Sequence, residues 1–152
     1  MITIIDDYIS KTQCNSILNL WSNTDVIVSQ DNIYRFQGFN LIPHLKKVID
    51  IIPELLNCDF KKFRIQCTDE DIEQVETTHL HLNCYSFVIF LNDNYSGGEL
   101  VFSEVSLKPK IGTMVYFTRD EAHRVENCIG KRFTLVGFLN NHLFTSQHTT
   151  LI

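Results

Sequence analysis

The feature that most constrains the fold of this 152-residue chain is a series of short apolar segments in its second half. From about residue 62 onward, runs rich in Val, Ile, Phe and Tyr alternate with polar or glycine-containing turns, as β-strands and their connections do. The runs read FRIQC, CYSFVIFLN, ELVF, GTMVYF, HRVENC and KRFTLVGFL. Their regular spacing predicts a β-sandwich or barrel of the jelly-roll kind.

The first sixty residues predict two helices. Ser10 and Gln13 have the spacing of a capping box, in which each side chain binds a backbone NH of the other residue. Apolar residues then recur at helical spacing for about three turns, at Cys14, Ile17, Leu18 and Trp21. A second helix is predicted from Pro43, which a first turn tolerates, to Pro53, which kinks or ends it. Its apolar stripe consists of Leu45, Val48, Ile49 and Ile52.

The length of the chain suits one compact domain, and its 44% apolar content is too high for disorder. No repeat, low-complexity tract or linker divides it. We therefore expect a single α+β domain over residues 1–152 that is mainly β. A helical N-terminal part at about 1–60 would pack on one sheet of a double-stranded β-helix (jelly-roll) core at about 61–140.

The charge and composition exclude several classes of partner. A net charge of −5 argues against nucleic acid, because phosphate binding needs clustered Lys and Arg. The N-terminus lacks the basic and apolar segments of a signal peptide, and no apolar run approaches the ~20 residues of a membrane span. Five cysteines without a CxxC pair are typical of reduced thiols. We expect a cytoplasmic protein that binds neither nucleic acid nor membrane, and the sequence does not indicate its oligomeric state.

Three histidines are candidate metal ligands. His79 and His81 lie two residues apart on a predicted strand, so their side chains project from the same face. His123 opens a later predicted strand. Three imidazoles that converge inside a sandwich would bind Fe, Zn or Ni. On spacing alone, surface histidines or hydrogen-bonded core histidines are the alternative.

The motifs around these histidines resemble those of the Fe(II)- and 2-oxoglutarate-dependent dioxygenases of the prolyl 4-hydroxylase type. In chain order they are HLH, a strand ending in FLN, GGE, the turn from Pro109 to Gly112, His123, and RFT from Arg132 to Thr134. The resemblance covers Phe63 to Leu139, and it extends more loosely to the N-terminus. There, IIDDYISKTQCNSIL looks like the opening strand, turn and helix of that family.

The resemblance assigns roles to these residues. In the family an HxD pair and a distal histidine, here His123, bind iron. An arginine nine residues beyond the histidine, here Arg132, binds the 5-carboxylate of 2-oxoglutarate, and Thr134 stands where the family often has a hydroxyl. The planar fork of an arginine suits a carboxylate, and a buried arginine on an apolar strand requires an anion. A structural salt bridge or a surface position is the alternative for Arg132.

The aspartate of the iron motif is missing in either of two registers. If His79 is the first ligand, His81 stands at the carboxylate position, and if His81 is first, Asn83 stands there. Loop length favours the first register, because the chain must cross to the other sheet before the next strand begins. Leu82 to Tyr85 then remains for this turn, against only Cys84 and Tyr85 in the second register.

Two departures from the family affect chemistry. A neutral imidazole in place of the carboxylate makes the metal centre one charge unit more positive, so that another divalent metal is an alternative to Fe(II). A carboxylate from Glu73 or Glu76 is an alternative third ligand. Phe90 stands where the family frequently has a tyrosine that helps to hold the 2-oxoglutarate carboxylate.

The resemblance therefore implies an Fe(II)- and 2-oxoglutarate-dependent oxygenase that hydroxylates a side chain of a protein or peptide, with prolyl favoured. Two alternatives stay open. The first is a catalytically inactive relative that binds a metal or a dicarboxylate, favoured by the missing aspartate and tyrosine. The second is a three-histidine metal enzyme of the cupin type that does not use 2-oxoglutarate.

Overall fold

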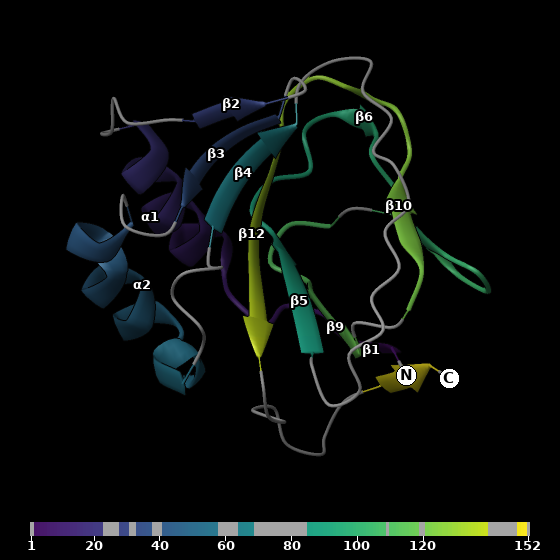
Figure 1. Cartoon of the computed structure of the whole chain (residues 1–152), viewed down its shortest axis with the longest axis horizontal. Helices are drawn as coiled ribbons and strands as arrows, with labels where there is room; N and C mark the ends of the chain where they lie inside the picture. Colours follow the sequence, from purple (N-terminus) through teal and green to yellow (C-terminus); the bar gives the residue numbers. More distant parts are fainter. Residues whose placement is uncertain are drawn as a thin grey trace.

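The computed structural model describes residues 2–22, 28–30, 33–37, 41–57, 64–68, 85–108, 110–118, 121–139 and 149–151. These residues form a main sheet of eight antiparallel strands that faces a three-stranded minor sheet (Figure 1). The main sheet contains, in spatial order, β13 (Thr149–Leu151), β1 (Ile2–Ile5), β9 (Met114–Thr118), β5 (Tyr85–Phe90), β12 (Arg132–Leu139), β4 (Arg64–Thr68), β3 (Ile33–Gln37) and β2 (Val28–Gln30). This is the predicted jelly-roll architecture.

The minor sheet has the order β10 (His123–Val125), β7 (Leu100–Phe102) and β8 (Ser106–Leu107). A short pair, β11 (Cys128–Ile129) with β6 (Ser96–Gly97), lies at one end of it. Gly97 and Gly98 both have positive φ, near +70°, as expected for the GGE turn. The turn lets the chain reverse between the main sheet and β7.

The helices cover the face of the main sheet that points away from β10 (Figure 1). Helix α1 (Lys11–Ser22) begins with the predicted capping box: the NH of Ser10 donates to Gln13 Oε1 at 2.8 Å, and the NH of Gln13 donates to Ser10 Oγ at 3.1 Å. Its buried residues are Cys14, Ile17 and Leu20. The first predicted helix and its position are confirmed.

The second helix is shorter and more irregular than an α-helix from Pro43 to Pro53. A 3₁₀ helix, η2 (Ile42–His44), leads into α2 (Leu45–Ile51), and a second, η3 (Pro53–Asn57), follows. The last bond of α2 runs from the NH of Ile52 to the carbonyl of Val48, and Pro53 has no NH with which to continue it. No helix in the described parts of the chain is long and apolar enough to cross a membrane.

Alternation along the strands divides the core into two clusters. On β5, Phe87 and Ile89 pack with the helices, whereas Val88 and Phe90 point into the space between the sheets, because successive strand residues face opposite sides. Cys14 and Cys128 are buried and form no disulfide with any described residue.

Three strands lie in the N-terminal part that sequence reasoning treated as helical. The opening strand, expected from the resemblance, is β1, which pairs with β9. Strands β2 and β3 were not expected, and β3 pairs with β4 from Ile33↔Thr68 to Gln37↔Arg64. The sequence IYRFQ alternates apolar and polar residues over only five positions, which is too short to distinguish a strand from a loop.

Candidate functional site

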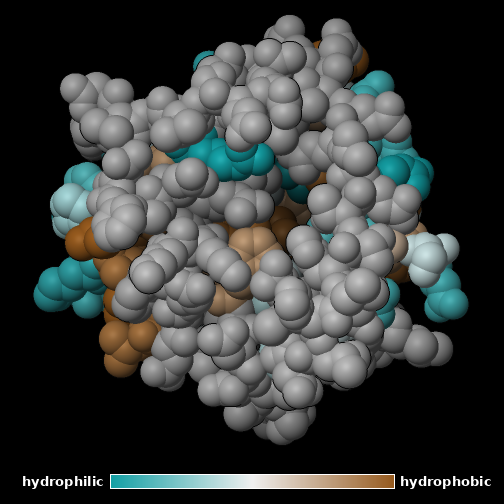
Figure 2. All heavy atoms as spheres, in the orientation of Figure 1, coloured by the Kyte–Doolittle hydropathy of each residue, from teal (hydrophilic) through white to brown (hydrophobic). Residues whose placement is uncertain are grey.

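The candidate site lies between the two sheets. A space-filling view in the orientation of Figure 1 shows hydrophobic residues at the bottom of a hollow there (Figure 2). Four of the predicted site residues are described, and all four face this space: Phe90, His123, Arg132 and Thr134. The other three, His79, His81 and Asn83, lie outside the described residues.

Arg132 is the first residue of β12 and is only 1% exposed. Its Nε donates to the carbonyl of Gly98 at 3.1 Å, and its Cζ lies 5.4 Å from the centre of the Phe90 ring. The ion pairs found among the described residues join other side chains, so Arg132 has no carboxylate partner there. Burial lowers the pKa of its guanidinium, which a bound anion would raise again. The guanidinium is therefore a buried cation without a counter-charge among the described residues.

Thr134 lies two residues further along β12 and on the same face. It is fully buried, and its Oγ1 has no hydrogen-bond partner among the described residues. Across the sheet it pairs with Phe90 on β5, which places the Phe90 ring beside both polar side chains. A buried hydroxyl without a partner and a buried guanidinium without a counter-charge among the described residues form a seat that fits a carboxylate.

His123 is the first residue of β10 and is partly buried. Its ring packs against Phe117 and Phe102, with centroids 4.9 and 5.9 Å away. Nδ1 lies 2.9 Å from the carbonyl oxygen of Glu121. A carbonyl can only accept, so the proton is assigned to Nδ1 and the lone pair to Nε2. This is the arrangement of a metal-binding histidine whose second nitrogen is held by the backbone.

A complete metal centre would need ligands beyond His123. Within the described segments, no group of three His, Cys, Asp or Glu side chains is placed to hold a metal ion. The donor that is present fits one ligand of an iron or zinc site, and the other ligands predicted from the sequence fall in the segment 69–84. Both predicted registers, with His79 and His81 or with His81 and Asn83, therefore stay predictions.

Sequence reasoning missed Tyr95 and the importance of Gly98. A Cβ on Gly98 would lie 2.8 Å from Tyr95 Cε2 and 3.0 Å from Arg132 Cδ, so that only glycine lets these two side chains meet over its backbone. The Tyr95 hydroxyl is buried, and no described residue accepts a hydrogen bond from it. The only sequence signal was a tyrosine just before the Gly-Gly turn.

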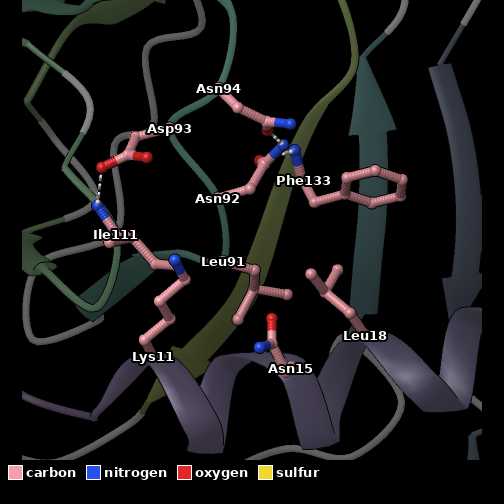
Figure 3. Close-up of a pocket in the computed structure, with 9 residues that line it drawn as sticks. All are labelled: Lys11, Asn15, Leu18, Leu91, Asn92, Asp93, Asn94, Ile111 and Phe133. Carbon is pink, nitrogen blue, oxygen red and sulfur yellow. Dashed lines mark hydrogen bonds between the residues drawn. The ribbon is translucent and has the colours of Figure 1, made fainter.

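A separate cavity of about 330 Å³ lies on the helix side of the main sheet, between α1 and the segment that follows β5 (Figure 3). Two of its polar residues have structural partners: the NH of Phe133 donates to Asn92 Oδ1 at 2.8 Å, and the NH of Ile111 donates to Asp93 Oδ2 at 3.1 Å. None of the predicted site residues lines it. These contacts tie the loops of the jelly roll to β12.

Comparison with protein families finds one match, in which the model of the 2OG-Fe(II) oxygenase superfamily covers residues 63–140. None of the curated proteins compared with the chain matches it.

Solved structures match almost the whole chain. An oxidoreductase of the 2OG-Fe(II) oxygenase family from Burkholderia pseudomallei has a TM-score of 0.72 at 16% identity, over 92% of this chain and 84% of that one. HygX from Streptomyces hygroscopicus, solved with nickel and 2-oxoglutarate, has a TM-score of 0.66 at 9% identity, over 95% and 84%. A prolyl hydroxylase from Trichoplax adhaerens, in complex with a hypoxia inducible factor peptide fragment, has a TM-score of 0.63 at 16% identity, over 91% and 83%. At these identities the likeness establishes the fold.

Proposed function

The chain belongs to the 2OG-Fe(II) oxygenase superfamily, and we propose that it hydroxylates a side chain of a protein or peptide, with prolyl favoured and with HxH in place of HxD. Fe(II) and 2-oxoglutarate are the metal and cosubstrate of this family. The observation that carries the proposal is the buried Arg132, which faces the interior with no carboxylate partner among the described residues.

Arg132 and Thr134 would hold the distal carboxylate of 2-oxoglutarate. The Arg132 Nε is already bound to the Gly98 carbonyl at 3.1 Å, which fixes the plane of the guanidinium before the ligand arrives. The Thr134 hydroxyl has no partner among the described residues, and it would donate to the carboxylate beside the terminal nitrogens of Arg132. The Phe90 ring closes one side of the seat, so that these hydrogen bonds form away from water.

His123 would supply one metal ligand through Nε2. His79 and His81 would supply the other two, and His81 with Asn83 is the alternative pair. Phe102 and Phe117, both at most 3% exposed, pack against the His123 ring and exclude water from that side. When bound, Fe(II) and 2-oxoglutarate supply the oxidative chemistry that places a hydroxyl on a substrate C–H bond.

A peptide substrate is the finer part of the proposal. Its support is the likeness to the Trichoplax adhaerens prolyl hydroxylase, which was solved with a peptide fragment. The hollow between the sheets opens on the face shown in Figure 2, where an extended peptide could reach the metal. The second candidate is an inactive relative that binds a dicarboxylate, and the HLH in place of HxD is the observation that favours it.

The test is an anaerobic titration of metal-free protein with Fe(II), with and without 2-oxoglutarate, followed by the visible metal-to-ligand charge-transfer band. We expect a band only when both are present, and no band in His123→Ala or Arg132→Ala. His44→Ala is the matched control, because His44 packs against Phe36 on the helix side. Metal binding without a band would favour the three-histidine alternative, whereas 2-oxoglutarate binding without metal would favour the inactive relative.

A further inference from the structure

Tyr95 lies beside the proposed carboxylate seat, although it comes from a different part of the chain. It precedes β6, and the Gly98 backbone holds it close to Arg132: a Cβ at position 98 would contact both side chains at 3.0 Å or less. The carbonyl oxygen of Gly98 also accepts a hydrogen bond from the Arg132 Nε–H. The GGE turn thus places a tyrosine and an arginine next to one another.

The Tyr95 hydroxyl lacks a partner that would explain its burial. The Arg132 guanidinium lies next to it and can donate to its oxygen, but no described residue accepts a hydrogen bond from it. A guanidinium has donors only, so it offers no acceptor for the tyrosine proton. Burial raises the pKa of Tyr95, and the hydroxyl therefore keeps its proton throughout the physiological range. The phenol is a permanent donor, and such a donor is costly to bury unless a ligand accepts its hydrogen bond.

We propose that Tyr95 donates a hydrogen bond to the distal carboxylate of 2-oxoglutarate, beside Arg132 and Thr134. This inference rests on the proposed function and names a further residue of the same site. It also accounts for Phe90, which stands where a hydroxyl is common in proteins that the sequence resembles. Here, Phe90 contributes only its ring under the guanidinium, and the hydroxyl comes from the loop before β6.

The experiment compares two ligands that differ only at the distal end. 2-Oxoglutarate and 2-oxopentanoate have the same chain length and the same metal-chelating 2-oxo acid, but 2-oxopentanoate ends in a methyl group. Their dissociation constants are measured anaerobically on the Fe(II)-loaded protein from the charge-transfer band. Wild type, Tyr95→Phe and the control Tyr116→Phe are compared. Tyr116 packs with the helix-side cluster, so that its hydroxyl lies on the opposite face of the main sheet.

We expect Tyr95→Phe to raise the dissociation constant of 2-oxoglutarate by about 10-fold, which corresponds to one hydrogen bond to a charged group. The dissociation constant of 2-oxopentanoate should stay within about 2-fold of the wild-type value. Tyr116→Phe should change neither constant. Because no described residue accepts a hydrogen bond from the lost hydroxyl, the unfolding midpoint of Tyr95→Phe should stay close to that of wild type.

Two results would overturn the inference and leave the proposed function standing. Equal weakening of both ligands would mean that Tyr95 only supports the fold, and unchanged affinity for both would mean that its hydroxyl does not reach the carboxylate. A third result is read in the wild type alone. If wild type does not prefer 2-oxoglutarate to 2-oxopentanoate, the carboxylate seat itself is wrong, and the inference fails with it.

Discussion

The two faces of strand β12 are built on opposite principles. On the face toward the helices, Phe133 and Leu135 belong to a continuous apolar cluster, and the Phe133 ring meets Trp21 of α1 edge-on at 5.4 Å. On the face toward the minor sheet, Arg132 and Thr134 are equally buried but polar, and their hydrogen-bonding groups are incompletely used by the described residues. The same four residues of backbone, 132 to 135, therefore carry both kinds of environment.

This difference separates stability from binding. Burial of the apolar residues on the helix side stabilises the folded state, whereas burial of a polar group without a hydrogen-bond partner destabilises it. A fold that keeps such groups must offset their cost elsewhere, and the helix-side cluster is large enough to do so. Substitutions on the two faces should therefore have opposite effects on folding and on ligand affinity.

The largest effect is expected for Arg132→Met, which replaces the guanidinium by an apolar chain of similar length. Affinity for 2-oxoglutarate should fall by about 10³-fold, or ~4 kcal/mol, because the distal carboxylate loses its buried cation. The free energy of unfolding without ligand should be unchanged or higher, since an unpaired buried charge is removed. The measurements are ligand titration and urea unfolding. A variant that is several kcal/mol less stable but still binds 2-oxoglutarate would assign Arg132 to the core instead.

Leu135→Ala tests the other face of the same strand. Leu135 is fully buried in the helix-side cluster, so its truncation should lower the free energy of unfolding by about 3 kcal/mol. Its side chain points away from the proposed seat, and the dissociation constant of 2-oxoglutarate should stay within about 2-fold of wild type while the protein is folded. A loss of affinity comparable to that of Arg132→Met would show that the two faces are not independent.

A smaller effect is expected from pH, through Cys14 on the helix side. Burial raises the pKa of its thiol from 9.0 to about 11. Above pH 9 the unfolded chain releases the proton but the folded chain retains it, so stability is complete below pH 9 and falls as pH rises, by about 1.4 kcal/mol per unit until pH 11. Unfolding of wild type and Cys14→Ala between pH 8 and pH 10.5 measures this. If the free energy of unfolding depended on pH in the same way in wild type and Cys14→Ala, Cys14 would not be the cause of the loss.

Most of the elements were predictable because their signals are local. The capping box at Ser10 and Gln13 and the GGE turn each depend on a few neighbouring residues, and the apolar runs are long enough to show their strands. Arg132 was identified through the family resemblance, nine residues beyond His123, and the cost of burying an unpaired charge supported that assignment. Strand β3 was not predicted from the sequence, because its five residues form a strand only through pairing with β4.

Tyr95 was not predicted as a site residue for a different reason. Nothing in its sequence neighbourhood distinguishes it from an exposed loop tyrosine, and its burial depends on contacts between segments more than thirty residues apart. A glycine at position 98, the backbone of β12 and the chain reversal before β7 together bring it to Arg132. Such a position follows from tertiary packing, which motif spacing does not encode.

The smallest effect, and the sharpest test of the two-face comparison, is expected for Thr134→Val. Valine has nearly the shape of threonine, and the Thr134 Oγ1 that it removes has no partner among the described residues. The ligand-free protein should therefore become more stable, by about 1 kcal/mol. Affinity for 2-oxoglutarate should instead fall by about 5-fold, because one of the donors to its distal carboxylate is lost. The two changes, measured by urea unfolding and by ligand titration, have opposite signs only if the hydroxyl is kept for a ligand.

Thr113→Val is the control, because the Thr113 hydroxyl already donates to Asp6 and its loss should lower stability without affecting binding. If Thr134→Val lost stability as Thr113→Val does, the Thr134 hydroxyl would have a hydrogen-bond partner in the protein. The face of β12 toward the minor sheet would then hold no polar group kept for a ligand.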